Sequence, residues 1–243
     1  MSNQHSFANV LIDDNNYPTD KRILIVTAVD AERDAVIRGL AKARPSRINV
    51  ISAGVGPAAV AARTATSIVN GTYELVISVG IGGGFPSRAS IGSLVLADSI
   101  VAADLGAETQ DGFLSVDQLG FGSSHVAVSE SWNDKLLSAL ALSGLTVVYA
   151  PIITVSSATG SSATAELRSQ LVPGAAAEGM EGYGVAIAAE QLGIPVMELR
   201  AISNEVGPRD RSAWRIGEAL QALEDASYAI ATLFPKHIDN LDT

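Results

Sequence analysis

The chain alternates short, strongly apolar runs with stretches of helical character, and this order constrains the fold most. Residues 23–28 have the sequence ILIVTA, which is typical of a strand buried on both faces of a sheet. A helical pattern follows directly, with Gly39 and Pro45 as stop signals. Because the same order recurs, we predict one α/β domain, with strands at 23–28, 49–53, 75–79, 92–102, 147–155 and 196–203 and helices at 30–40, 58–69, 179–192 and 214–234.

Composition and charge narrow the classes of partner. Hydrophobic residues make up 47% of the 243 residues, which is ample material for a core. The formal net charge of −10 argues against a nucleic-acid partner, because phosphate binding needs a basic surface. The chain has no cysteine and only three histidines, so we expect no disulfide, no thiol chemistry and no metal site.

The first 20 residues are polar and lack the basic and apolar regions of a secretory signal. We expect them to form a flexible N-terminal tail ahead of a folded domain at 21–243. Apolar runs such as 23–29 fall well short of the about 20 residues that a membrane-spanning helix needs. We therefore predict a cytoplasmic protein without a membrane segment.

Ligand sites in such sheets form beyond the carboxyl ends of the strands. Three segments there carry polar residues or glycine: Asp30-Ala-Glu32, the glycine run at 80–85, and residues 204–211. Glu32 lies in the first turn of its predicted helix, where the helix dipole favours a carboxylate that acts as a base or holds water. The alternative is a glutamate that only helps to start the helix.

The glycine run Gly80-Ile-Gly82-Gly83-Gly84-Phe85 predicts a loop whose backbone, at Gly82 and Gly83 in particular, approaches a ligand closely. It lacks the Gly-Lys-Ser/Thr ending of a phosphate-binding P-loop. It also departs from the dinucleotide fingerprint G-x-G-x-x-G, because Phe85 takes the last position. A tight bend between strand and loop is an equal alternative.

Two carboxylates, Glu178 and Glu181, lie three residues apart at the start of a helical pattern and would share a helix face. A carboxylate suits a vicinal diol, since it offers two acceptor oxygens and no donor. Acidic charge at a helix N-terminus is the alternative.

Four motifs follow one another along the chain: Val26-Thr-Ala-Val-Asp-Ala-Glu32, the glycine run with Ile91-Gly-Ser-Leu-Val, Gly179-Met-Glu181-Gly, and Arg200-Ala-Ile-Ser-Asn204. In this order they resemble the nucleoside phosphorylase/nucleosidase superfamily over residues 22–234. The resemblance implies a three-layer α/β/α fold with a mixed, partly barrel-like central sheet. It also implies cleavage of the N-ribosidic bond of a small nucleoside, no metal or organic cofactor, and a homo-oligomer.

The resemblance implies roles for single residues as well. N-ribosidic cleavage develops positive charge on the sugar and negative charge on the departing base. Glu181 matches the glutamate that holds the ribose hydroxyls, and Met180 beside it would pack on the sugar. Glu32 matches the carboxylate that deprotonates the attacking water. Arg200 matches an arginine near that water, and it would equally keep the carboxylates charged by pairing with them.

Asn204 stands where the adenine-releasing relatives carry an aspartate that protonates purine N7. An amide side chain has one acceptor and one donor group, so it would accept from N7–H and donate to an oxygen at C6. A mismatched buried polar pair costs about 1–3 kcal/mol, which favours a 6-oxopurine such as hypoxanthine over adenine. A loop asparagine that bonds only local backbone is the alternative.

Phosphorolysis is the main competing reaction. Phosphorylases of the superfamily bind phosphate through arginines, one of them just before the glycine run. Here that stretch is Ile77-Ser-Val-Gly-Ile81, with no arginine and an apolar side chain at 81. A phosphate without a guanidinium partner would bind poorly, so we expect water as the nucleophile.

The stretches 102–109 and 206–218 resemble one subgroup of nucleosidases, whose substrate carries a benzoate on its 5′ side. Arg209, Arg211 and Arg215 would supply the cation and Trp214 the apolar wall for that group, and a solvated basic patch is the alternative. The stretch 154–162 lacks the aromatic residue that relatives stack on the base, so we expect Phe85 to take that place.

Alternatives from other classes stay open. A dinucleotide-binding module would need a glycine fingerprint after the first strand, where Thr27-Ala-Val-Asp stands. A non-catalytic nucleoside sensor would need only the residues that grip the ligand. Within the enzyme class, an adenine-releasing nucleosidase or a purine nucleoside phosphorylase is the runner-up.

Overall fold

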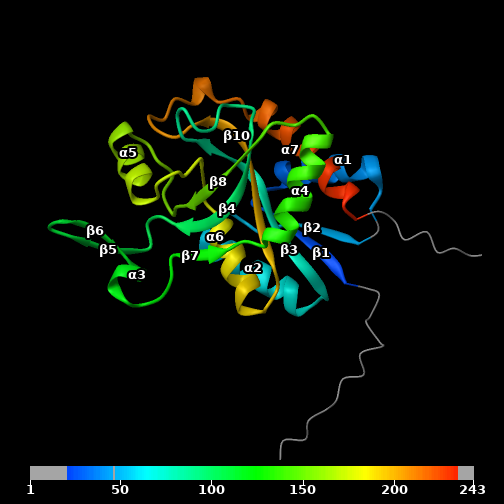
Figure 1. Cartoon of the computed structure of the whole chain (residues 1–243), viewed down its shortest axis with the longest axis horizontal. Coiled ribbons are helices and arrows are strands. Elements are labelled where there is room, and N and C mark those ends of the chain that lie inside the picture. The colour runs from blue at the N-terminus through cyan, green and yellow to red at the C-terminus, as the bar shows by residue number, and fades with distance from the viewer. Residues whose placement is uncertain (1–20, 46, 235–243) are drawn as a thin grey trace, which may run out of the picture.

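The computed structural model describes residues 21–45 and 47–234, and the expected tail at 1–20 lies outside them (Figure 1). The strands are β1 Arg22–Thr27, β2 Ile48–Ser52, β3 Tyr73–Gly84, β4 Leu94–Ala102, β5 Gly106–Thr109, β6 Gly112–Ser115, β7 His125–Ala127, β8 Val147–Thr154, β9 Ala177–Gly179 and β10 Val196–Glu205. The α-helices are α1 Asp30–Ala43, α2 Pro57–Val69, α3 Val116–Leu119, α4 Glu130–Leu142, α5 Ser162–Leu171, α6 Gly182–Gln191 and α7 Ile216–Thr232.

Part of the main sheet closes on itself. Strands β10, β4, β8, β9 and β3 pair in that order, and β10 also pairs with β3, which completes a barrel-like ring. From β3 the sheet continues outward through β1 to β2 in parallel pairing. The pairs β10–β4, β3–β9 and β4–β7 are antiparallel, so the sheet is mixed. The predicted partly barrel-like mixed sheet is confirmed.

Both faces of the sheet are covered. Ile23 and Ile25 of β1 belong to an apolar cluster with residues of α1, α4 and α7, whereas Leu24 and Val26 belong to a second cluster with residues of α2 and α6. Figure 1 shows these two groups of helices on opposite sides of the strands. Burying each such aliphatic side chain contributes about 1.5–3 kcal/mol. The α/β/α layering and the doubly buried first strand are confirmed.

Two helices, α1 and α7, have bounds that differ from the predicted ones. Helix α1 continues through Gly39 to Ala43, although Gly39 was expected to end it. A Cβ atom at Gly39 would lie 2.1 Å from the carbonyl oxygen of Glu224 in α7, so this glycine permits the close approach of the two helices. Helix α7 begins at Ile216 rather than at 214, and Ile216 is 43% exposed although an apolar stripe with Leu223 and Ile230 was expected on this helix; those two residues are buried.

The glycine run is strand and not the predicted loop. Strand β3 continues to Gly84, and its glycines pair with β10 on one side and with β9 on the other. A Cβ atom at Gly82 would lie 2.7 Å from the carbonyl oxygen of Glu178, and one at Gly84 would lie 2.3 Å from that of Ala89. The missing side chains therefore allow the backbone to approach closely where the ring closes.

The predicted helix at 179–192 begins later, at Gly182. Glu178 lies in strand β9, and Glu181 is the residue just before α6. The two glutamates therefore do not share a helix face, and the sequence-based prediction was wrong on this point. Pairing of β9 with β3 and β8 accounts for the extended backbone at Glu178, because those long-range hydrogen bonds override the local helical pattern.

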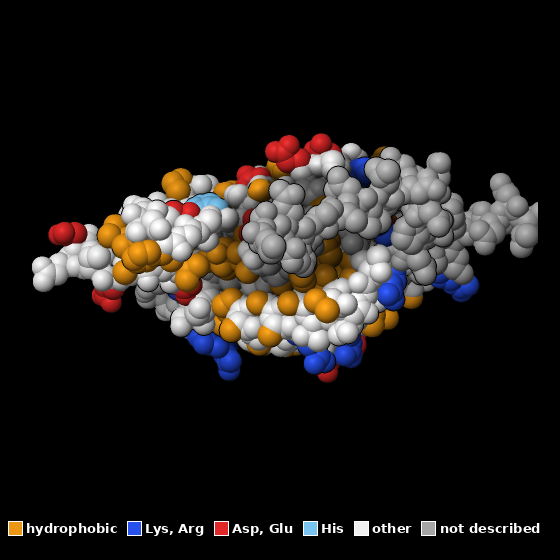
Figure 2. Space-filling view, turned by 90° about the horizontal axis from the view of Figure 1, so that it is seen from below, with side chains coloured by type: hydrophobic (Ala, Val, Ile, Leu, Met, Phe, Trp, Pro, Cys, Tyr) orange, Lys and Arg blue, Asp and Glu red, His pale blue; other side chains and the backbone are white. Residues whose placement is uncertain are grey.

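Several segments were not assigned from the sequence: β5, β6, β7, α3, α4 and α5. Strands β5 and β6 form a separate two-stranded sheet that projects from the body together with α3 (Figure 1). Leu105, Leu114 and Phe121 of this arm are exposed, Phe121 by 83%. Figure 2 shows hydrophobic side chains gathered behind the tip of the arm, at the left of that view. No helix in the described part of the chain combines the length and apolarity needed to cross a bilayer.

Candidate active site

A cavity of about 370 Å³ lies at the ends of β1, β3, β9 and β10. This volume falls in the range of small-molecule sites. Eight of the residues predicted from the sequence line it: Glu32, Gly82, Gly83, Met180, Glu181, Asn204, Arg209 and Trp214. These residues come from four separate stretches of the chain, and the carboxyl ends of the strands bring them together as the sheet argument predicted.

Glu32 is held in a fixed position by backbone donors. One carboxylate oxygen accepts from the N–H groups of Ala28 (3.0 Å) and Val29 (3.2 Å), and the other accepts from that of Ile81 (2.9 Å). The residue is only 4% exposed. Burial raises the pKa of the Glu32 carboxyl above its usual value, while the Ile81 N–H and the charge of Arg200 oppose that rise. A buried carboxylate with a raised pKa is suited to accept a proton from water near neutral pH.

Glu181, the second carboxylate of the site, is also held by backbone donors. Its Oε1 accepts from the N–H of Gly56 at 3.2 Å, and its Oε2 accepts from the N–H of Met180 at 3.3 Å. It precedes the first turn of α6, where the helix dipole stabilises a negative charge. Both oxygens keep lone pairs with which they can accept hydrogen bonds from a diol.

Arg200 lies behind the cavity wall, where it is 1% exposed. Its Nε donates to Glu198 at 2.8 Å, one terminal nitrogen donates to Ser78 at 3.0 Å, and the other is 3.5 Å from Glu181. A Cβ atom at Gly80 would lie 2.5 Å from Arg200 and 2.8 Å from Glu32, so both side chains pack against this glycine. Arg200 therefore acts on the two cavity carboxylates from behind.

Asn204 reaches the cavity from the end of β10, and its amide is oriented by its neighbours. Its Nδ2 donates to the carbonyl oxygen of Glu205 at 3.0 Å, and a carbonyl oxygen can only accept. The amide oxygen therefore faces the hydroxyl of Ser203, at 2.8 Å. One N–H and one oxygen lone pair of the amide remain for a ligand.

The segment after β10 forms one rim of the cavity. The guanidinium carbons of Arg209 and Arg211 lie 5.7 Å and 5.9 Å from the centre of the Trp214 ring. Arg209 and Trp214 line the cavity, whereas Arg211 does not. Both cations lie within the about 6 Å at which a cation is attracted to the face of an aromatic ring.

Phe85 is not brought to the cavity. It is 3% exposed and packs in a third apolar cluster with Val101, Ile153 and Val206. It lines a different hollow, which shares only residues 205–208 with the cavity. A buried aromatic ring there serves the packing beneath α5.

The sequence argument missed several residues at this site. The N–H of Gly56, in the segment after β2, holds Glu181, and Val55 lines the cavity. Thr159 also lines it, and no local pattern marks this residue; Glu178, which was expected on a helix face beside Glu181, lines the cavity from strand β9. Glu198 had a signal, since it precedes Arg200 by two residues in a strand and so points to the same face.

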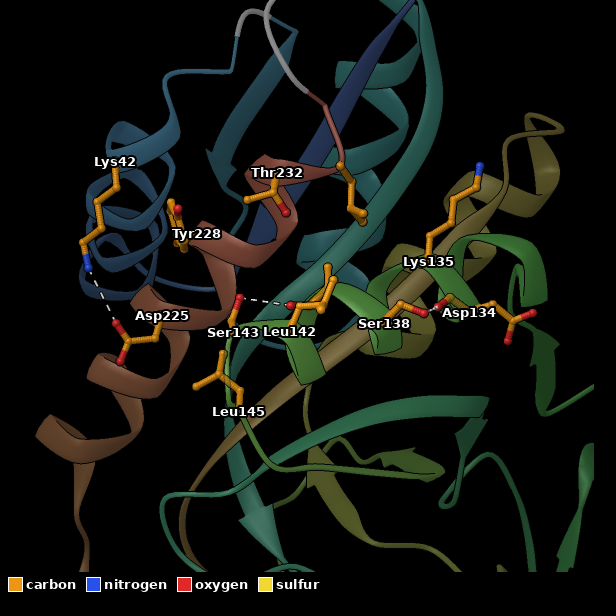
Figure 3. A pocket seen from close by; sticks show the side chains of 12 residues that line it. Lys42, Asp134, Lys135, Ser138, Leu142, Ser143, Leu145, Asp225, Tyr228 and Thr232 are labelled. Carbon is orange, nitrogen blue, oxygen red and sulfur yellow. Dashed lines mark hydrogen bonds and ion pairs between the residues drawn. The ribbon is translucent and has the colours of Figure 1, made fainter.

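A groove of about 1200 Å³ lies elsewhere, between α4 and α7 with Lys42 of α1 at its edge (Figure 3). An ion pair joins Lys42 and Asp225 there at 3.5 Å. None of the residues predicted to bind or react lines this groove.

Across residues 21–45 and 47–234, no group of three or more histidine, aspartate or glutamate side chains is arranged to hold a metal ion.

Comparison with known proteins agrees with the resemblance seen in the motifs. The family model described as "Phosphorylase superfamily" matches residues 30–235. Futalosine hydrolase of Streptomyces coelicolor is 49% identical over 223 residues, which cover 84% of this chain and 92% of that protein. Futalosine hydrolase of Acidothermus cellulolyticus is 44% identical over 218 residues, which cover 85% and 89%.

Solved structures share the fold. Futalosine hydrolase of Helicobacter pylori superposes with a TM-score of 0.75 at 18% identity, over 88% of this chain and 97% of that chain. The 5′-methylthioadenosine/S-adenosylhomocysteine nucleosidase of the same organism gives a TM-score of 0.76 at 16% identity, over 88% and 98%. At these identities the likeness concerns the fold alone.

Proposed function

The chain belongs to the phosphorylase superfamily, and on that premise we propose that it hydrolyses the N-ribosidic bond of futalosine. The products are hypoxanthine and dehypoxanthinyl futalosine, on the futalosine route to menaquinone. One observation carries the proposal beyond sequence similarity: Glu32, Glu181 and Asn204 come from distant parts of the chain and line a single cavity.

Glu32 and Glu181 have different roles at the ribose. Glu181 accepts hydrogen bonds from the ribose hydroxyls, and Met180 packs beside it. Glu32 takes a proton from the water that attacks C1′ as the C1′–N9 bond breaks and its electron pair passes to the base. The negative charge of Glu181 stabilises the positive charge that develops on the ribose, and the effect is large because the residue is buried.

Asn204 receives the departing base. With Nδ2 facing Glu205 and the amide oxygen facing Ser203, the amide keeps one donor and one acceptor for the ligand. The donor suits O6 and the acceptor suits N7–H of hypoxanthine. Because an amide is not an acid, N7 takes its proton from water, or the base leaves as a hydrogen-bonded anion.

The charge of the cavity favours water over phosphate as the nucleophile. Among the described residues that line it, Arg209 is the one cation, against the four carboxylates of Glu32, Glu178, Glu181 and Glu205. A phosphate dianion would meet repulsion there, since its usual partners are guanidinium groups. Ile81, which also lines the cavity, offers phosphate no side-chain donor.

Arg209 supplies the cation for the 5′ side of the substrate. It lies at the rim with Trp214, so a carboxylate would pair with the guanidinium while an aromatic ring packs on the indole. Arg211 supports this arrangement from outside the cavity through its cation–π contact with Trp214.

We also propose that the protein forms a homo-oligomer and is located in the cytoplasm. The projecting arm exposes Leu105, Leu114 and Phe121, and exposed apolar side chains of this kind favour association with another protein surface. Light scattering of the purified protein is expected to give a multiple of the 25.1 kDa chain mass. A mass equal to one chain at micromolar concentration would contradict the oligomer.

One assay tests the activity. The protein is incubated with futalosine, inosine or methylthioadenosine, with and without inorganic phosphate, and the released base is identified by chromatography. We expect hypoxanthine from futalosine at a rate that phosphate does not change, and little adenine from methylthioadenosine. Preferential release of adenine, or a strict need for phosphate, would refute the assignment.

A further inference from the structure

One wall of the cavity is built from a segment with hardly any apolar side chain. Residues 156–161 connect β8 to α5 and have the sequence SSATGS. Ala158 and Thr159 of this segment line the cavity. Ordering a residue costs about 1–2 kcal/mol, and side chains this small bury too little apolar area to offset that cost. Polar contacts must therefore hold this wall.

A buried cluster of three side chains supplies those contacts. Arg168 of α5 and Glu178 of β9 form an ion pair of 2.8 Å, and their side chains are only 10% and 8% exposed. The hydroxyl of Thr159 contacts both of them. The other carboxylate oxygen of Glu178 accepts from the N–H of Thr159 at 2.7 Å, and Arg168 donates to the carbonyl oxygen of Ser157 at 2.8 Å.

The cluster also ties the wall to the strand that leads to the ribose-binding glutamate. Glu178 pairs with Gly83 of β3, and it precedes Glu181 by three residues. A hydrogen bond of 3.0 Å from the N–H of Val155 to the carbonyl oxygen of Gly179 joins the same two segments. At its beginning, the wall is held by Asp104, which accepts from the N–H of Ser156 at 2.6 Å.

A gain in stability alone does not explain why the chain has a buried ion pair between Arg168 and Glu178. Replacing a buried ion pair by apolar side chains of similar size is often neutral or stabilising, whereas buried polar clusters can select one conformation. Here the conformation selected is that of a segment with no apolar packing of its own. The conformational entropy of this segment is then lost during folding rather than on binding, so its ordering does not reduce the affinity for the ligand.

We propose that Arg168 and Glu178 are positioning residues that hold residues 157–159 as a preformed wall of the nucleoside pocket. They set the affinity for substrate and leave the bond-breaking step to Glu32. This inference rests on the proposed function for its kinetic part only, because the order of the wall is a property of the free protein.

The decisive variant is Arg168→Met/Glu178→Leu, which removes both charges and leaves no uncompensated one in the interior. In the free protein, hydrogen exchange at the amide of Thr159 is expected to speed up about tenfold or more, because its carboxylate acceptor is gone. With futalosine, KM is expected to rise about 10- to 100-fold while kcat stays within about threefold. Saturating hypoxanthine is expected to restore part of the amide protection.

Two further variants sharpen the test. Arg168→Lys keeps the charge but loses the two-pronged contact to Glu178 and Ser157, so its KM is expected to lie between those of wild type and the double variant. Arg88→Gln is the matched control, since Arg88 also donates to a backbone carbonyl, that of Ala175 at 2.8 Å, but lines a different hollow. It is expected to leave KM and the Thr159 amide unchanged.

Wild-type exchange and KM in the double variant would overturn the inference. A loss of kcat at unchanged KM would also overturn it, because Glu178 would then act in the chemistry. If the wild-type protein releases no hypoxanthine from futalosine, the proposed function fails, but the exchange comparison still decides whether Arg168 and Glu178 order the wall.

Discussion

Replacing Glu32 by glutamine is expected to lower kcat for futalosine about 10²- to 10⁴-fold with KM nearly unchanged. Glutamine keeps the size of the side chain, and its amide oxygen can still accept from the N–H groups of Ala28 and Val29, while its NH2 loses the hydrogen bond from Ile81. It cannot take a proton from water, so the substrate binds while the nucleophile is no longer activated. Single-turnover kinetics with equilibrium binding of futalosine separates the two quantities.

The loss of wild-type activity at low pH is expected to follow the protonation of Glu32 as well. Glu32 works as the carboxylate, and burial raises its pKa above the ordinary 4.5 of a glutamate. Activity is therefore expected to fall as the pH drops through this raised pKa, at a higher pH than an exposed glutamate would give. Asp30→Asn is the control, because Asp30 lies in the same first turn of α1, two residues before Glu32, but is exposed and pairs with Arg33 at 2.8 Å. Unchanged kcat in Glu32→Gln would remove this residue from catalysis.

Replacing Arg200 by methionine is expected to lower the free energy of unfolding by about 3–5 kcal/mol. The guanidinium is 1% exposed and is the ion-pair partner of Glu198, which is 0% exposed. Without it, Glu198 is left buried without a counter-charge, and the pKa of Glu32 rises further because Arg200 no longer opposes the effect of burial. Urea denaturation measures the first effect, and the pH profile of any remaining activity measures the second.

A second substitution separates stability from function at Arg200. Glu198→Gln in the Arg200→Met background removes the orphaned charge, so part of the stability is expected to return while activity stays low. Arg33→Met is the surface control: its ion pairs with Asp30 and Asp34 are solvent-accessible, and such pairs contribute about 0–1 kcal/mol. Equal stability losses in Arg33→Met and Arg200→Met would disprove the role assigned to the buried arginine.

The elements that follow from local patterns could be predicted from the sequence. The run at 23–28 indicates a strand buried on both faces, and alternate residues of β1 indeed enter two different clusters. The placement of Glu32, Glu181 and Asn204 around one cavity follows from a general rule, because ligand sites in such sheets gather at the carboxyl ends of strands. Side-chain chemistry then limits what each residue can do.

The prediction failed where contacts between distant residues decide the local structure. The glycines at 80–84 have a loop-like composition, yet they form strand because β9 and β10 approach them from both sides. Gly39 has the composition of a helix stop, but α1 continues because α7 packs against it. Glu178 and Glu181 are close in sequence and were expected to act together, but strand pairing separates their roles.

The sequence by itself therefore determined the class of fold, the order of its main strands and helices, and the residues whose side chains can carry the chemistry, because these depend on hydrophobic periodicity and functional groups that are local properties. Only the tertiary structure decided which strands close the ring, that Arg200 lies behind the cavity wall rather than in the cavity, and that Arg168 and Glu178 meet beside the short run of small side chains that lines the cavity. Those features depend on which distant segments meet, and the free energy of their contacts exceeds the local preferences of the residues involved.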